Sequence, residues 1–263
     1  MLAHLMPKRR RLSRALPIAS LLALGLVAGA APAEAGTKAM GIDVSRFQGA
    51  IDWPSVSASG IRFAFVQASR GSGADCATAP DRCGADEFYA RNINRARAFG
   101  VRVGPYHRAF AGGDTVAGAI ADATVEAELF IGEVEAAGGL HSGDLRPALD
   151  VETPFGGLNA TELTTWVRTW LDHVQAALGV KPVIYTNASS WQATGNTTEF
   201  ALDGNPLWVA HWGVAAPSVP AGYWGGAGWS VWQYSSSGHV KGIKGNVDLD
   251  RLGPAGFAVI SVP

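Results

Sequence analysis

Charged residues are scarce in this chain. Asp, Glu, Lys and Arg make up 16% of its 263 residues, whereas about 25% is usual for a soluble protein. The formal net charge is −1, but five of the 21 basic residues and only one acidic residue lie in the first 35 positions, so the rest of the chain carries a net charge of −5. A mildly acidic body lacks the basic stripe that nucleic-acid binding needs, and we expect no nucleic-acid partner.

Cysteine is nearly absent as well. Cys76 and Cys83 are the only two, and both lie in the stretch GSGADCATAPDRCGADE, which contains no histidine. A structural zinc site takes four ligands, so this pair predicts no metal site. In an oxidising compartment the two cysteines would instead form a disulfide that closes a surface loop.

Long apolar runs are confined to the N-terminus. The basic stretch KRRRLSR precedes the run ALPIASLLALGLVAGAA, and Ala33-Glu34-Ala35 then supplies a small-x-small cleavage pattern. This order predicts a signal peptide over residues 1–35 and export from the cell. The alternative is a membrane anchor, but the run is short for a span and contains glycine and proline. We therefore expect no stable membrane association after cleavage.

Neither a linker nor a short repeat interrupts residues 36–263, which we interpret as a single domain. Eight short β-rich runs follow one another through this segment. They are Met40–Ser45, Arg62–Ser69, Val101–Phe110, Arg146–Glu152, Pro182–Thr186, Leu207–His211, Ser230–Tyr234 and Asn246–Leu249.

Helical patterns separate only the earlier runs. They cover Glu87–Phe99, Thr115–Ala137 and Thr161–Leu178, each with a glycine soon after its end, and Asn159 and Glu162 are spaced as a cap at the start of the third. Strands that alternate with helices indicate a parallel sheet. The pattern predicts an α/β fold, an irregular TIM-like (β/α) barrel of eight strands whose helices are missing in the second half.

Two carboxylates end the fourth predicted strand. Asp150 and Glu152 are one residue apart, so a strand places both on one face and Val151 on the other. In a barrel of this kind the active site lies at the carboxyl ends of the strands. Neighbouring acids there repel each other, so one ionises and one keeps its proton, which suits cleavage of a glycosidic bond.

Asp43 and Asp248 end the apolar runs MGID and GNVD in the first and last predicted strands. A closed barrel would bring these strands together and complete an acidic group with Asp150 and Glu152. The same acids could instead bind a divalent cation, which is the runner-up interpretation of the group.

Aromatic and amide side chains also fall near the predicted strand ends. Sugars pack their C–H faces on aromatic rings and need polar partners for their hydroxyls. Tyrosine, tryptophan, histidine and glutamine at these positions are therefore candidates for sugar contact, although core packing explains the tryptophans equally well. The candidates are Tyr106, Tyr185, Trp208, His211 and Gln233.

Six segments, in this order, resemble glycoside hydrolase family 25, the Chalaropsis-type lysozymes or N-acetylmuramidases. They are MGIDVSRFQGAIDW, GVRVGPYHRA, PALDVE, PVIYTN, LWVAHW and WSVWQYSSSGHVKGIKGNVDLDRL, and together they span nearly all of residues 38–252. The chain departs from the family at Gln67-Ala-Ser-Arg70-Gly71, where members often carry a Lys-Ala-Thr/Ser-Glu-Gly segment. One wall of the expected groove is thereby altered.

The resemblance implies a secreted enzyme that cleaves the β-1,4 bond between N-acetylmuramic acid and N-acetylglucosamine in peptidoglycan. It implies Glu152 as general acid, Asp150 as the group that assists the substrate acetamide, and Asp43 and Asp248 as supporting acids. No cofactor is expected, the partner is the glycan strand of the cell wall, and we expect a monomer. The alternatives are a chitin-type glycosidase and a non-catalytic cell-wall glycan-binding protein.

Overall fold

The computed structural model describes residues 1–2, 39–71 and 83–263, and the last two segments contain a closed barrel of eight strands. Around the barrel the order is β1-β9-β8-β7-β6-β5-β4-β2, and β2 returns to pair with β1. A ninth, short strand, β3, lies outside the barrel on β2. The strands are β1 (Met40–Val44), β2 (Ile61–Arg70), β3 (Gly84–Ala85), β4 (Arg102–Arg108), β5 (Ala148–Asp150), β6 (Val183–Thr186), β7 (Leu207–Ala210), β8 (Val231–Gly238) and β9 (Val247–Leu252).

Each of the eight predicted runs forms one barrel strand, so the predicted fold class is confirmed. One expectation was wrong: β9 runs antiparallel to both β1 and β8, whereas the other neighbours in the barrel are parallel. The chain between β8 and β9 is too short to hold a crossover helix, so it returns as a hairpin-like connection. Asp248 therefore lies at the start of its strand, not at the end.

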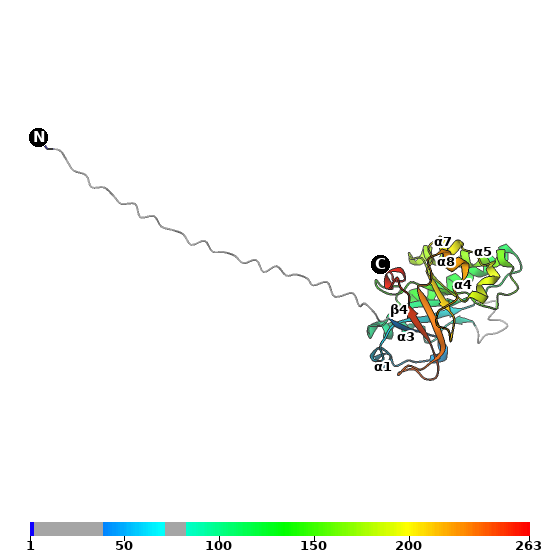
Figure 1. Ribbon diagram of the computed structural model, residues 1–263, viewed down its shortest axis with the longest axis horizontal. Helices are drawn as coiled ribbons and strands as arrows, with labels where there is room; N and C mark the ends of the chain where they lie inside the picture. Colours follow the sequence, from blue (N-terminus) through cyan, green and yellow to red (C-terminus); the bar gives the residue numbers. More distant parts are fainter. Residues whose placement is uncertain (3–38, 72–82) are drawn as a thin grey trace. The chain divides into compact units, whose positions relative to one another are not determined.

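Long helices are confined to the first half, as predicted. The α4 and α5 helices pack side by side against the barrel (Figure 1), and the predicted cap of α5 is present, because Asn159 and Glu162 form a reciprocal capping box. After β6 only short helical turns remain. The helices are α1 (Trp53–Ala58), α3 (Tyr89–Ala98), α4 (Val116–Ala136), α5 (Ala160–Leu178), α6 (Ala188–Trp191), α7 (Glu199–Leu202) and α8 (Pro220–Gly225), with 3-10 turns η1 (Arg46–Gln48), η3 (Gln192–Thr194) and η4 (Phe257–Val259).

The apolar core has two layers, one inside the barrel and one between barrel and helices. Inside, Phe65 stacks on Trp208 with ring centroids 4.3 Å apart, and Tyr185 meets the same indole edge-on at 4.6 Å. The outer layer contains the apolar faces of α3, α4 and α5. Strand alternation assigns side chains to the two layers, so it also decides which residues can reach the barrel mouth.

A buried hydrogen-bond network of polar side chains crosses the outer layer of the core. His107 accepts from or donates to Ser69 Oγ through Nδ1 at 2.8 Å, and its Nε2 lies 2.7 Å from Glu126 of α4. The spacing resembles a Ser-His-acid triad, but all three residues are fully buried away from the barrel mouth. Burial lowers the pKa of His107 to about 3, so the ring is neutral. This hydrogen-bond network links α4 to strands β2 and β4 of the barrel.

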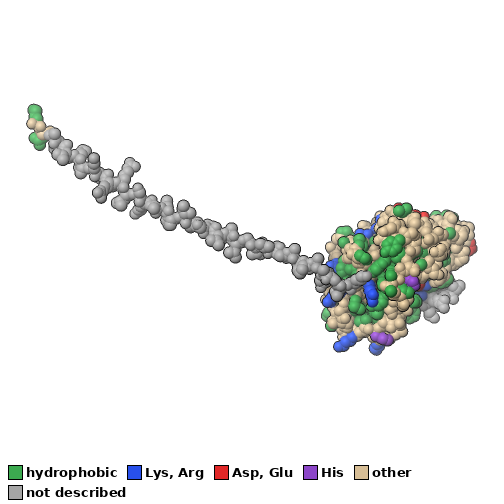
Figure 2. Space-filling model, viewed as in Figure 1, with side chains coloured by type: hydrophobic (Ala, Val, Ile, Leu, Met, Phe, Trp, Pro, Cys, Tyr) green, Lys and Arg blue, Asp and Glu red, His purple; other side chains and the backbone are tan. Residues whose placement is uncertain are grey.

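The described residues contain no helix long and apolar enough to cross a membrane. Lys38–Pro263 group into one unit and Met1–Thr37 into another. Apart from its first two residues, the predicted signal peptide lies outside the described residues, and so does Cys76. On the face drawn in Figure 2, Lys and Arg side chains are scattered among apolar and polar ones.

Candidate active site

The two carboxylates at the end of β5 share a cavity, as their spacing predicted. Asp150 is the last residue of the strand and is 6% exposed, whereas Glu152 lies two residues beyond it and is more accessible. Val151, between them, is buried in the outer core layer. Both acids line a cavity of about 300 Å³ at the mouth of the barrel. The alternation of an extended chain thus holds both acids toward one hollow.

The first and last strands bring a second group of acids to this mouth. Asp43 of β1 lies opposite Asp248 of β9 in the antiparallel register, which confirms that closure of the barrel brings them together. Asp250, two residues along the same strand, is fully buried, and its Oδ1 accepts a hydrogen bond of 2.8 Å from Trp208 Nε1. The carboxyl group of Asp43 lies close enough to those of Asp248 and Asp250 for each to influence the pKa of the other.

Burial and mutual repulsion keep protons on this group. Burial, with the nearby carboxyls of Asp250 and Asp248, raises the pKa of Asp43 well above its usual range. Burial also raises the pKa of Asp248, and it raises the pKa of Asp250 to about 8. At neutral pH the group therefore retains protons that it can donate in hydrogen bonds.

Asp150 differs from this group in its protonation, because nearby cations partly offset the rise in its pKa that burial causes. Burial raises the pKa of Asp150 to about 6, while Arg108 and Arg70 act in the opposite direction. The Arg108 Nη1 atom lies 3.3 Å from Asp150 Oδ2 and also contacts the carboxylate of Glu152. At neutral pH Asp150 is mostly ionised, so the site holds a negative charge beside a set of protonated carboxyls.

Gln233 connects the acids to the aromatic side of the site. Its Nε2 donates a hydrogen bond of 2.7 Å to Asp43 Oδ2. Its Oε1 accepts from Tyr185 OH at 3.0 Å and from Trp212 Nε1 at 2.9 Å. Each polar atom of the buried amide is thus engaged, which fixes its orientation. Tyr185 and Trp212 are held in turn at the edge of a neighbouring hollow.

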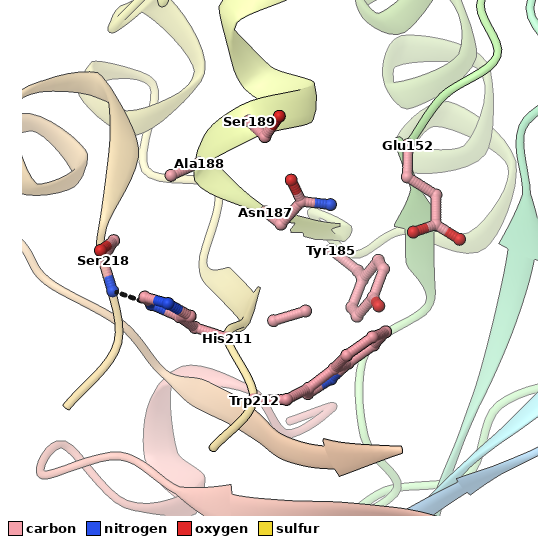
Figure 3. Close-up of a pocket in the computed structure, with 9 residues that line it drawn as sticks. Glu152, Tyr185, Asn187, Ala188, Ser189, His211, Trp212 and Ser218 are labelled. Carbon is pink, nitrogen blue, oxygen red and sulfur yellow. Dashed lines mark hydrogen bonds between the residues drawn. The ribbon is translucent and has the colours of Figure 1, made fainter. Parts of the chain in front are cut away.

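This neighbouring hollow has a volume of about 460 Å³ and shares Glu152 and Tyr185 with the acidic cavity. Figure 3 shows Glu152, Tyr185 and Trp212 at one end of it and His211 with Ser218 at the other. The backbone N–H of Ser218 donates to His211 Nδ1 at 2.9 Å, which leaves Nε2 as the ring nitrogen that carries the proton. The two hollows form one groove, with Glu152 where they meet.

The structure brings all the sequence-predicted site residues to this groove. Tyr106 and Trp208 line the acidic cavity, but Trp208 is only 1% exposed and forms its floor. His211 lines the second hollow, and Tyr185 lines both. No group of three or more His, Cys, Asp and Glu side chains in residues 39–71 and 83–263 is arranged to hold a metal ion. Cys83 is buried, and its predicted pairing with Cys76 stays a prediction.

Sequence reasoning missed several residues of the site. Asp250 repeats the spacing of Asp150 and Glu152, so period-two alternation from Asp248 could have found it. Arg108 is the last residue of β4, and a basic residue at a strand end gives no signal of its own. Arg70 was noted only as part of the departure from the family and was given no role. Trp212 lies beyond β7, at the end of the segment LWVAHW, and was not among the predicted sugar contacts.

A closed α/β barrel whose mouth holds ionised and protonated carboxyls beside aromatic and amide side chains has the features of a glycoside hydrolase. The chain belongs to that class and to one family within it: the sequence profile described as Glycosyl hydrolases family 25 matches residues 42–243. The family and the enzyme class suggested by the sequence motifs are thereby confirmed.

Individual relatives agree with this assignment. The chain is 36% identical to "Lysozyme M1" of Streptomyces globisporus over 221 residues, which cover 81% of this chain and 67% of that protein. It is 29% identical to an "N,O-diacetylmuramidase" of Chalaropsis sp. over 221 residues, 79% of this chain and 95% of that protein. The crystal structure of a bacterial lysozyme from Streptomyces coelicolor superposes with a TM-score of 0.68 at 33% identity and covers 82% of this chain and 93% of that one.

Proposed function

We propose that this enzyme is an exported muramidase that hydrolyses the β-1,4 bond between N-acetylmuramic acid and N-acetylglucosamine in peptidoglycan. The observation that carries the proposal is the position of Glu152 where two hollows of one groove meet, directly beside the ionised Asp150. Membership of family 25 and the names of its lysozyme and muramidase relatives support it. A signal peptide over residues 1–35 and a Cys76–Cys83 disulfide belong to the same proposal.

In this proposal Glu152 is the general acid. The sugar that keeps the new reducing end occupies the acidic cavity, the leaving sugar occupies the second hollow, and Glu152 protonates the oxygen between them. Arg108 contacts both Asp150 and Glu152, and a guanidinium favours the ionised form of a carboxyl beside it. A general acid must carry a proton when the substrate is bound, so this role requires the substrate to weaken the contact between Glu152 and Arg108.

Asp150 has the complementary role. Its Oδ1 atom is buried and lacks a hydrogen-bond partner among the described residues. An ionised acceptor of this kind can take the N–H of the substrate acetamide and orient the acetamide oxygen toward the anomeric carbon. The oxygen then acts as nucleophile, and the configuration at that carbon is retained. The alternative is direct attack by water with inversion, and NMR of the first-formed anomer distinguishes the two.

Substitution of Glu152 tests the proposal. Glu152→Gln keeps the size of the side chain but cannot give a proton, so we expect clearing of purified cell walls to fall about 100-fold or more. The matched control is Glu135→Gln, which changes an exposed acid near the end of α4 that lines neither hollow. This variant should clear walls at the wild-type rate. Equal clearing by the Glu152 variant and the wild type contradicts the role of Glu152.

The products decide between this proposal and its alternatives. A mass spectrum of digested peptidoglycan should show N-acetylmuramic acid at the new reducing ends. N-acetylglucosamine at those ends, with faster cleavage of chitin oligomers, would point to a chitin-type glycosidase. Tight binding to walls with no products from the wild type would point to a glycan-binding protein.

A further inference from the structure

The acidic cavity contains a buried cation that makes no direct ion pair with a carboxylate of the described residues. Arg70, the last residue of β2, is 9% exposed and lines the same cavity as Asp150 and Glu152. Its Nε atom has no hydrogen-bond partner, and no ion pair within residues 39–71 and 83–263 includes its guanidinium. Burial of a charge without an ion-pair partner lowers the stability of the folded protein. We therefore ask what function Arg70 could serve in this cavity.

A β-bulge places Arg70 in the cavity. The pairing of β2 with β4 shifts register between Gln67 and Ser69. Up to that point Gln67 faces the interior and Ala68 the outer layer, but Ser69 then also faces outward, toward His107. Without this extra residue, strict alternation would point Arg70 outward; with it, the Arg70 side chain points into the cavity. Bulges often re-aim a side chain beside an active site in this way.

The surroundings of the Arg70 guanidinium contact it without forming an ion pair to it. Its Cζ atom lies 5.2 Å from the ring centroid of Phe110, and that of Arg108 lies 5.5 Å from the same ring. Arg108 is already engaged with Asp150, Glu152 and a backbone oxygen. Burial and the repulsion from Arg108 and Arg46 lower the pKa of Arg70, and the attraction of Asp150 acts in the opposite direction. Within the described part of the chain no ion pair or hydrogen bond to Asp150 forms, so the Nε donor of Arg70 remains available.

We propose that Arg70 binds a carboxylate of the glycan substrate, in the same cavity as the sugar whose acetamide Asp150 orients. This inference rests on the proposed function, because N-acetylmuramic acid differs from N-acetylglucosamine by a lactyl ether that ends in a carboxyl group. Arginine suits a carboxylate because its planar fork can donate two parallel hydrogen bonds.

Two parts of the substrate present this group. The lactyl carboxylate is free where the stem peptide has been removed, and the stem peptide has carboxylates of its own where it is present. Recognition of the free lactyl group would place this enzyme after a reaction that hydrolyses the lactyl amide bond.

Three soluble substrates distinguish the sources: peptide-bearing glycan strands, strands stripped of peptide, and stripped strands whose lactyl carboxylates have been converted to amides. With Arg70→Gln we expect KM to rise about 10-fold or more on a substrate that offers the carboxylate. Arg70 also favours the ionised form of Asp150, so any accompanying fall in kcat should be the same on all three substrates. Arg70→Lys, which keeps the charge, should recover part of the loss. Arg62→Gln, at the exposed other end of the same strand, is the matched control.

The pattern of KM values identifies the carboxylate. A rise on stripped strands that disappears after amidation assigns Arg70 to the lactyl group. A rise confined to peptide-bearing strands assigns it to the peptide. The same KM as the wild type on all three substrates, or an equal rise on all three including the amidated one, overturns the proposal.

A binding measurement separates this inference from the enzymatic function. In NMR titrations the wild type should bind N-acetylmuramic acid more tightly than N-acetylglucosamine, and Arg70→Gln should abolish that preference. If the wild type hydrolyses none of the strands but shows this preference, the muramidase proposal fails and the carboxylate site stands. If it clears walls but prefers neither N-acetylmuramic acid nor its peptide-bearing form to N-acetylglucosamine, the carboxylate site fails instead.

Discussion

At the scale of single residues, the site combines acids with opposite protonation at neutral pH. Asp150 ionises because Arg108 and Arg70 offset its burial, whereas Asp250 is fully buried, and its closest charged neighbours are other carboxyls. Residues of one chemical type thus differ in charge because their surroundings differ. This difference in protonation lets Asp150 bind through its charge, while the protonated carboxyls around Asp250 act as hydrogen-bond donors.

The protonated Asp250 should make stability depend on pH. Its pKa is about 8 in the folded protein against an ordinary value of 3.8. Between these pH values the folded state binds the additional proton, so this residue lowers the free energy of unfolding as pH rises from about 4 to about 8. Asp250→Asn cannot titrate but can still accept from Trp208, so urea unfolding should show a flatter pH dependence than the wild type.

Asp172→Asn, an exposed acid of α5, is the control for this experiment and should keep the wild-type dependence. His107 acts in the opposite direction at lower pH, because its pKa is depressed and its contribution is lost as pH falls from about 6.5 to about 3. The comparison is therefore made as a difference between variant and wild type at each pH. An unchanged slope in Asp250→Asn would refute the assignment.

At the scale of elements, local sequence signals determined the helix boundaries. The Asn159 Oδ1 atom accepts hydrogen bonds from the backbone N–H groups of Thr161 and Glu162 at 3.0 and 3.1 Å. In return, the Asn159 backbone N–H donates to Glu162 Oε2 at 2.9 Å. These contacts involve residues at most three positions apart, which is why the sequence alone predicted them. Gly179, with a positive φ, ends the same helix.

Removal of this cap should weaken the protein without altering the site. Asn159→Ala leaves the first N–H groups of α5 without their side-chain acceptor, and we expect the free energy of unfolding to fall by about 1 kcal/mol. Chemical denaturation measures the loss, and kcat on soluble glycan strands should stay at the wild-type value. Gln175→Ala, exposed in the same helix, is the control and should be nearly neutral. A stability equal to wild type in Asn159→Ala would show that the cap contributes nothing.

At the scale of the whole molecule, the barrel closes around large interior side chains, and a glycine in β1 leaves room for one of them. A β-carbon at Gly41 of β1 would overlap the ring of Phe63, which fills the barrel interior. Closure thus depends on complementary side-chain volumes contributed by neighbouring strands.

Gly41→Ala should therefore destabilise the barrel by about 1–3 kcal/mol, the usual cost of overpacking. Phe63→Leu in the same chain should restore part of the loss, because the smaller side chain leaves room for the added methyl group. Gly132→Ala in α4, where no atom lies nearby, is the control and should be neutral or stabilising. Thermal unfolding compares the three, and absence of any rescue in the double variant would contradict this account of closure.

Period-two alternation and helical spacing in the sequence determined the eight barrel strands, the three long helices and the shared face of Asp150 and Glu152, because all of these depend on neighbours within a few residues. The antiparallel direction of β9 follows from the short connection after β8, which the prediction of a parallel sheet did not take into account. The tertiary structure alone decided the proton-sharing group around Asp250 and the entry of Arg70 into the cavity. Protonation follows from burial among distant acids, and the orientation of Arg70 follows from a bulge in its pairing with β4. Both depend on residues far apart in the chain, which no local pattern can reveal.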